Sequence, residues 1–329
     1  MIDVAVVGLG WWGRTVVGVL AGSDRLRPVL GVDTQPEGRQ WAADQGLAVT
    51  GELRDALADP RISAVILCSP HRSHAEQVVA AAEAGKHVFC EKPFTTTVAE
   101  ADTALAAVAA AGVRLGIGHE RRFEPAVLEL QELCRSGALG TPLVFEGNFS
   151  QDKFLSLPPD NWRLSGTEAP VGPLSATGIH LVDLAISILG EPSEVWARLS
   201  TRATAFANGD TLTVTLGFVS GATAAITAVL ATPFLGRVCV LGSGGWMEIR
   251  DRSHPESPSG WDVTTQYRDA DPSIRFVPPS PAVRDNLERF AASVEGDGDY
   301  PVTAADIRAN VRAFEAITRS AHSGRIERV

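Results

Sequence analysis

The stretch VAVVGLGWWG, residues 4–13, decides the fold. An apolar run with strand character leads into the spacing Gly-x-Gly-x-x-Gly, and a helical stretch follows from residue 14. In such a strand–turn–helix unit Gly8 permits a tight turn, Gly10 lets the backbone approach a pyrophosphate, and Gly13 lets the helix pack on the strand. The helix N-terminus adds unpaired N–H groups and a positive dipole for the phosphates. The stretch therefore predicts a dinucleotide-binding turn.

Asp33 supports this prediction. It ends the second predicted strand, 33 − 8 = 25 residues after Gly8, where a carboxylate can accept hydrogen bonds from ribose hydroxyls. Thr34 and Gln35 follow it, rather than a basic residue that would hold a 2′-phosphate. The sequence thus favours NAD, while Arg39 is near enough to keep NADP open.

The first third of the chain alternates apolar strands with helices. Alternation of this kind indicates a doubly wound parallel sheet, a Rossmann domain over residues 1–120. The predicted strands are 4–8, 29–33, 64–68, 88–90 and 113–117, and the predicted helices are 14–21, 39–45, 53–58, 74–84 and 98–111.

The alternation of strands and helices ends after residue 140, where strand-like runs occur with few helices between them. Residues 121–329 are therefore predicted to form an α+β domain with a large, mostly antiparallel open sheet. One helix is expected over 176–189, residues 251–271 are expected to form a surface loop, and two closing helices are free to pack back on the first domain.

Composition excludes several classes of function. A formal net charge of −10 argues against a nucleic-acid footprint and an anionic membrane surface. The four cysteines (Cys68, Cys90, Cys134 and Cys239) lack CxxC spacing and are expected to be reduced, and the N-terminus shows no basic n-region of a signal peptide. A cytoplasmic location is expected.

The uncharged run 211–236 alternates with strand period and is broken at Ser220-Gly221, so it predicts a hairpin rather than a membrane span. Because no charge faces water across the run, the hairpin is expected to be covered on both faces. This predicts a homodimer or homotetramer built through the C-terminal sheet.

Lys92 is notable because lysine is scarce in this chain. Only Lys86, Lys92 and Lys153 are lysines among 29 basic residues. Arg cannot readily lose its proton, so a lysine in such a chain suggests a place that needs an ammonium.

Three polar loops follow consecutive strands of the predicted sheet. They are Ser69-Pro70-His71, Glu91-Lys92-Pro93 and the five residues from His119 to Phe123. Ligands of doubly wound sheets bind beyond the carboxyl ends of the strands. Lys92 is therefore expected next to a bound nicotinamide.

These residues resemble the Gfo/Idh/MocA oxidoreductases (glucose-fructose oxidoreductase, inositol dehydrogenase and relatives). The resemblance rests on GLGWWG at 8–13, on the run 69–94 with its AGKHVFCEKP motif, on RRFEPAV at 121–127, on NWR at 161–163, and on GPLSATGIHLVD at 172–183. It covers nearly the whole chain.

The resemblance implies NAD(P)-dependent oxidation of a secondary alcohol on a sugar, polyol or related cyclic small molecule. It assigns Lys92 to a hydrogen bond with the reacting hydroxyl, His180 to the general base, and Asp183 to a place beside them. Trp162 and Arg163, with Lys92, His180 and Asp183, are expected on the substrate. The residues expected on the cofactor are Gly8, Gly10, Trp11, Trp12, Gly13, Asp33, Ser69, Pro70, His71, His74, Glu91, Lys92, Glu120 and Arg122.

The sequence departs from the family pattern at Ala176. Many members carry an acid there, four residues before the histidine, which completes a Lys–Asp–His set. Glu91, Glu120 or Asp183 is left to substitute, or Lys92 acts alone.

Several readings of individual residues stay open. Trp11 and Trp12 are either pocket walls or core aromatics, and His74 is expected to pack the helix start near the cofactor. Arg122 and Arg163 either bind substrate oxygens or a carboxylate, or brace the domain junction.

Other functions also stay open. His180 and Asp183 lack a third ligand of suitable spacing, so no metal is expected. A dihydrodiol or carboxylated-ring dehydrogenase and a non-catalytic NAD(P)-binding regulator are the alternatives.

Overall fold

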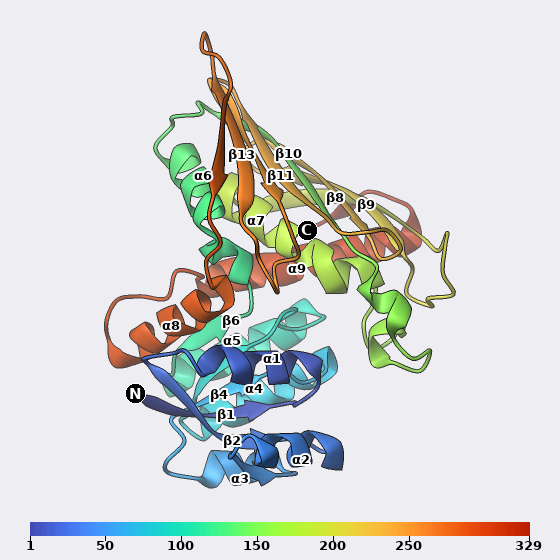
Figure 1. Cartoon of the computed structure of the whole chain (residues 1–329). Coiled ribbons are helices and arrows are strands. Elements are labelled where there is room, and N and C mark those ends of the chain that lie inside the picture. Colours follow the sequence, from blue (N-terminus) through green and yellow to red (C-terminus); the bar gives the residue numbers. More distant parts are fainter. The chain divides into compact units, whose positions relative to one another are not determined.

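A computed structural model describes all 329 residues, and the chain divides into two compact units (Figure 1). Unit 1 comprises Met1–Glu120 and Ala282–Arg308, and unit 2 comprises Arg121–Pro281 and Ala309–Val329. Residues 282–308, which the sequence-based division left in the second domain, thus return to the first.

Unit 1 is built on a parallel sheet of six strands in the order β3-β2-β1-β4-β5-β6. The strands are β1 (Ile2–Val7), β2 (Leu26–Val32), β3 (Ala48–Thr50), β4 (Ala64–Leu67), β5 (His87–Cys90) and β6 (Leu115–Ile117). The strand order reverses between β1 and β4, which pair directly with Val7 opposite Leu67. Doubly wound sheets bind their ligands at such a reversal.

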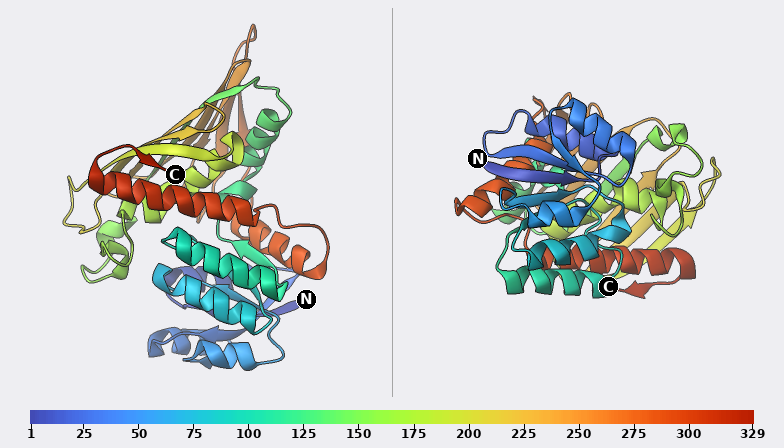
Figure 2. Two further views of the ribbon diagram at one scale, coloured as in Figure 1. Left: turned by 180° about the vertical axis from the view of Figure 1, so that it is seen from behind. Right: turned by 90° about the horizontal axis from the view of Figure 1, so that it is seen from below.

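Helices cover both faces of this sheet. They are α1 (Trp11–Leu20), α2 (Pro36–Asp44), α3 (Leu53–Ala58), α4 (His74–Glu83), α5 (Val98–Ala111) and α8 (Ala282–Glu295). α1 lies in front of the sheet in Figure 1, and α4 and α5 lie in front of it in the view from behind (Figure 2). Thr97 begins α5 with a reciprocal capping box to Glu100.

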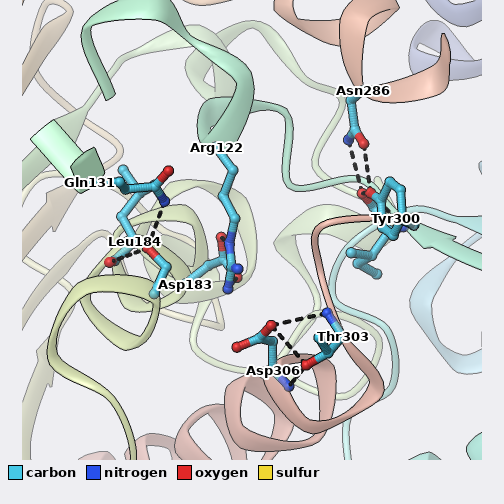
Figure 3. A network of polar contacts seen from close by, with 10 residues as sticks. Arg122, Gln131, Asp183, Leu184, Asn286, Tyr300, Thr303 and Asp306 are labelled. Atoms are coloured by element: carbon cyan, nitrogen blue, oxygen red, sulfur yellow. Dashed lines mark hydrogen bonds and ion pairs between the residues drawn. The ribbon is translucent and has the colours of Figure 1, made fainter. Parts of the chain in front are cut away.

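The returning segment completes the core of unit 1. Phe290 of α8 packs against Phe89 with ring centroids 5.6 Å apart. Tyr300 and Asn286 bind the edge strand, because both the Tyr300 hydroxyl and the Asn286 Nδ2 donate to the Ile117 carbonyl, at 2.9 Å each. Figure 3 shows the contact between Tyr300 and Asn286.

Unit 2 is built on a sheet of nine strands in the order β14-β13-β12-β11-β7-β10-β9-β8-β15. All neighbours are antiparallel except β7 and β10. The strands are β7 (Pro142–Ser150), β8 (Pro192–Ser200), β9 (Thr211–Phe218), β10 (Thr223–Val229), β11 (Leu235–Gly242), β12 (Gly245–Asp251), β13 (Trp261–Tyr267), β14 (Ser273–Val277) and β15 (Glu327–Arg328). These two sheets confirm the predicted fold class.

One face of the nine-stranded sheet forms the core of unit 2 with α6 (Pro125–Arg135), α7 (Ile179–Leu189) and α9 (Ala304–Ser323). The long helix α9, red in Figure 2, contributes Phe314 and Ile317 to this core. The opposite face carries exposed residues such as Thr213, Thr215 and Ala225.

One local prediction was wrong, and two local features were missed. Residues 251–271 are not a loop throughout, because Trp261–Tyr267 form β13, in which Trp261, Val263 and Thr265 alternate inward. The Ser, Pro and Asp residues on either side concealed this short strand. β3 was missed because its three residues are hardly buried, and the helix expected from residue 176 instead begins with a π-helical turn at Leu174–Gly178.

Candidate active site

The glycine-rich turn after β1 has the backbone that a dinucleotide needs. Gly8 has φ +86°, and a Cβ there would lie 2.7 Å from the Ser69 nitrogen. A Cβ at Gly13 would lie 1.9 Å from the Gly8 oxygen, so helix and strand approach as closely as glycine allows. A Cβ at Gly10, by contrast, would meet nothing within 4 Å. The turn therefore fits a pyrophosphate, with open space above Gly10.

Asp33 is fixed beside this turn. Its Oδ2 accepts from the Leu9 nitrogen at 2.6 Å and its Oδ1 from the Gln35 nitrogen at 2.8 Å. Arg39 Nη1 donates to the Asp33 and Thr34 carbonyls at 2.7 and 2.9 Å. The carboxylate thus stands next to the turn, and the guanidinium of Arg39 is held on backbone oxygens.

The two tryptophans of the turn differ in their environments. Trp11 is 50% exposed, whereas Trp12 is half-buried, and their rings lie 5.5 Å apart. Burial raises the pKa of Glu91, and the Trp12 indole and the charge of Lys92 counteract this. Glu91 also fills the space beside Gly118, where a Cβ would lie 2.3 Å from its Oε2. These contacts place Glu91 inside the unit.

His74 connects two of the predicted loops. Its Nε2 lies 2.9 Å from the Ser69 carbonyl and its Nδ1 lies 2.8 Å from the Pro93 carbonyl, and the side chain is fully buried. Burial lowers the pKa of His74, and the carbonyl contacts partly offset this. The Lys92–Pro93 peptide bond is cis, and Lys92 is half-buried. His74 therefore holds the loop that presents Lys92.

His71, Pro70 and Glu120 complete the predicted cofactor residues of unit 1. Pro70 precedes the short 3-10 turn His71–Ser73 after β4, and the ring of His71 lies 5.9 Å from that of His74. Glu120 is 8% exposed and begins the 3-10 turn Glu120–Phe123.

In unit 2, His180 stands on the first turn of α7. It is 4% exposed and its ring lies 6.0 Å from that of Phe149 at the end of β7. The π-helical turn Leu174–Gly178, which contains Ala176, leads into it. Single π-helical turns of this kind are frequent at functional sites.

Arg122 and Asp183 form a buried bidentate ion pair. Arg122 Nε and Nη2 donate to Asp183 Oδ2 and Oδ1, both at 2.7 Å (Figure 3). Both carboxylate oxygens therefore serve Arg122. The pair brings together a residue expected on the cofactor and one expected at the catalytic centre, and Asp183 is one of the three acids left to substitute for the acid missing at Ala176.

A second buried cluster surrounds Arg121, whose side chain is 1% exposed. Its guanidinium donates to Glu124 at 3.1 and 3.2 Å and to both oxygens of Asp251 at 2.9 Å. The indole of Trp261 donates to Asp251 at 2.9 Å. The pKa of Glu124 is raised to about 7, because burial raises it more than Arg121 lowers it and the charge of Asp251 adds to the rise.

Trp162 and Arg163 lie in the segment before the π-helical turn. The Arg163 guanidinium stacks over the Trp162 ring at 4.4 Å, and burial lowers the pKa of Arg163 to about 10. Asn208 supports this segment, since its Nδ2 donates to the Arg163 and Ala169 carbonyls at 2.8 Å each.

Sequence reasoning missed three residues around these side chains. His254 packs on Phe149 and Phe234 at 5.6 and 5.4 Å, and Asn208 is buried beneath the 163–172 segment. Nothing local in the sequence marks Asn208, His254 or Phe234, because their partners lie 20 to 105 residues away along the chain.

The predicted site residues thus form two groups. Unit 1 gathers the glycine turn, Asp33, and the loops around Ser69 and Lys92, whereas unit 2 gathers His180, Asp183, Arg122 and Arg163. No three His, Cys, Asp or Glu side chains are arranged to hold a metal ion, and no helix is long and apolar enough to cross a membrane.

A parallel sheet with this glycine turn, an acid after the second strand and a separate domain with a mostly antiparallel sheet define a dinucleotide-binding protein of the Rossmann class. Residues 2–119 match a family described as "Oxidoreductase family, NAD-binding Rossmann fold", and residues 127–248 match its C-terminal domain. The chain belongs to the Gfo/Idh/MocA family of NAD(P)-dependent oxidoreductases.

Individual relatives agree with this assignment. The uncharacterized oxidoreductase YrbE of Bacillus subtilis is 30% identical over 276 residues, which are 82% of this chain and 79% of YrbE. Levoglucosan dehydrogenase of Pseudarthrobacter phenanthrenivorans is 36% identical over 155 residues, 46% of this chain but only 39% of that enzyme. The aldose-aldose oxidoreductase of Caulobacter crescentus, solved with glycerol, is 28% identical with a TM-score of 0.88, covering 100% of this chain and 99% of that one.

Proposed function

We propose that the protein oxidises a secondary alcohol on a sugar, polyol or related cyclic compound. The observation that carries the proposal is the loop of Lys92, which follows β5 of the NAD-binding sheet and is held by His74. The similarity to a levoglucosan dehydrogenase and to an aldose-aldose oxidoreductase supports this class of substrate.

Lys92 and His180 have separate roles in the proposed reaction. When bound, NAD accepts a hydride from the carbon that bears the hydroxyl. Lys92 Nζ donates a hydrogen bond to the oxygen of that hydroxyl and stabilises the negative charge that develops on it. The imidazole of His180 takes the hydroxyl proton, so that the alcohol loses one hydride and one proton in total.

Asp183 is assigned a positioning role in this scheme. Because both its oxygens accept from Arg122, we propose that the pair orients α7 and so the backbone of His180. This leaves Lys92 and His180 to handle the proton without the acid that many relatives carry at the position of Ala176.

The test of the proposal is Lys92→Met, which keeps the side-chain length and removes the charge. We expect turnover of a sugar and polyol panel to fall roughly 10²–10⁴-fold, the weight of a positioned acid–base group. NADH affinity should change little.

Lys86→Met is the matched control. Lys86 Nζ donates to the Asp59 and Ile62 carbonyls at 2.9 and 2.8 Å, so it has a structural role. This variant should melt at a lower temperature and keep its turnover per folded molecule. If Lys92→Met behaves like Lys86→Met, Lys92 is structural too and the mechanism is wrong.

We also propose that the protein forms a homodimer or homotetramer through the outer face of the nine-stranded sheet. Four large apolar side chains stand exposed on that face: Trp196 (37%), Leu235 (39%), Ile274 (76%) and Phe276 (47%). Ile274 and Phe276 are neighbours on β14, and the outward residues of β9 and β10 carry no charge, which supports the proposal that this face is covered.

A further inference from the structure

Arg163 differs from the other arginines that are not exposed. Arg121, Arg122 and Arg237 bind carboxylates, and Arg14 and Arg39 bind backbone carbonyls. No carboxylate or carbonyl oxygen accepts from the guanidinium of Arg163, which only stacks on Trp162. A cation that loses water without gaining a counter-ion is costly, so an anionic partner is expected when the site is in use.

The backbone of Arg163 is held by hydrogen bonds and its guanidinium by stacking before any ligand arrives. The backbone nitrogen of Arg163 donates to Asn161 Oδ1 at 3.1 Å, and its carbonyl accepts from Asn208 Nδ2 at 2.8 Å. The Trp162 ring fixes the side chain from one side. Such a preorganised cation loses little conformational freedom when it binds an anion.

Asn208 connects Arg163 to the segment that carries His180. The Gly172 nitrogen donates to the Asn208 carbonyl at 2.7 Å, and Gly172 lies 180 − 172 = 8 residues before His180. The buried Asn208 therefore connects Arg163 to the segment that precedes His180, the proposed general base.

The charge balance indicates which anion fits. The other basic groups of these segments are neutralised: Arg122 by Asp183 at 2.7 Å, and Lys153 by Glu256 at 2.5 Å. The guanidinium of Arg163 thus keeps its single positive charge, and its planar shape matches one carboxylate, whereas a phosphate carries more charge and usually recruits further donors.

We infer that Arg163 receives a carboxylate of the substrate, which is then a hydroxy acid: a sugar or cyclic polyol that carries both the reacting secondary alcohol and one carboxylate. The inference rests on the proposed function and narrows its substrate class.

The experiment compares acids with their neutral counterparts. D-glucuronate and D-glucose, and D-galacturonate and D-galactose, are offered with NAD to the wild type, Arg163→Gln, Arg163→Lys and the exposed-site control Arg325→Gln. Arg163→Gln should lower kcat/KM for the acids roughly 10- to 100-fold, as expected for a hydrogen bond between charged groups. It should leave the neutral compounds unchanged. Arg163→Lys should retain part of the preference, and Arg325→Gln all of it.

A second readout does not depend on turnover. The melting temperature of each variant, loaded with NADH, is measured with and without each compound. The acids should stabilise the wild type more than the neutral sugars do, and Arg163→Gln should abolish the difference. Without ligand, Arg163→Gln should melt no lower than the wild type, because it removes a buried charge that has no partner; a structural arginine would give a lower melting temperature.

The two proposals fail differently. Absence of NADH formation with every compound contradicts the proposed oxidation, and the melting measurements then decide the carboxylate site alone. Equal response to acids and neutral sugars in both readouts, or an equal loss for both in Arg163→Gln, overturns the carboxylate assignment.

Discussion

Replacing Glu124 with glutamine tests how the buried cluster around Arg121 distributes its charge. Two carboxylates, Glu124 and Asp251, share one guanidinium, so full ionisation leaves one negative charge in excess inside unit 2. Asp251 also accepts a hydrogen bond from the Trp261 indole. Glu124 lacks this donor and is therefore the carboxyl that we expect to stay protonated as the pH rises.

The sign of the effect follows from the pKa of Glu124, which is raised from the ordinary 4.5 to about 7. Between these two pH values the folded protein binds more protons than the unfolded chain. The free energy of unfolding therefore falls as pH rises through this window. At about 1.4 kcal/mol per pH unit, the full loss is at most about 3 kcal/mol.

Glu124→Gln cannot titrate, and its amide oxygen can still accept from Arg121. The variant should match the wild type near pH 4.5 and become more stable by up to about 3 kcal/mol above pH 7.5. Urea unfolding at five pH values between 4.5 and 8.5 measures the difference. Glu132→Gln, an exposed position on the same helix α6, is the control and should show no such trend.

If the free energy of unfolding depends on pH in the same way for the wild type and Glu124→Gln between pH 4.5 and 8.5, the reasoning is refuted. This result would mean that Glu124 stays ionised down to its ordinary range and that Arg121 outweighs burial.

Three further predictions concern the cofactor, the base and the sheet. Asp33→Ala should weaken NAD binding more than NADP binding, and tighter binding of NADP by the wild type in calorimetry would contradict the assignment of NAD. Ala176→Asp should raise the pKa of the His180 imidazole and move the acidic limb of the rate–pH profile to higher pH; an unchanged limb would mean that another group titrates. In light scattering the wild type should have a mass above that of the monomer. Trp196→Glu or Thr215→Arg on the outer sheet face should shift the measured mass towards that of the monomer. A monomeric wild type at micromolar concentration would contradict the proposed interface.

The fold was predictable because its signals are local and periodic. The glycine spacing, the apolar strands of unit 1 and the alternating hairpin that became β9 and β10 each specify their structure within a short window. β13 was not predictable in this way, since its seven residues are weakly apolar, and the burial of Trp261 and Val263 comes from their packing into the core of unit 2.

The sequence predicted which loops contribute to the candidate site, but not the contacts between their side chains. Loop positions after β4 and β5 followed from topology, whereas the pairing of Arg122 with Asp183 joins residues 61 positions apart. The scarcity of lysine did not single out Lys92, because Lys86 uses its ammonium to bind two carbonyls within the fold. Which basic group is neutralised, and by which acid, depends on tertiary placement.

The return of residues 282–308 to unit 1 has a consequence for dissecting the protein. A fragment that ends at residue 120 contains all six strands but lacks Phe290, Tyr300 and Asn286. It would expose the apolar surface around Phe89 and leave the end of β6 without its side-chain bonds. The nucleotide-binding unit is thus encoded by two separated stretches of the gene, and exchanging it between relatives requires transplanting both stretches together.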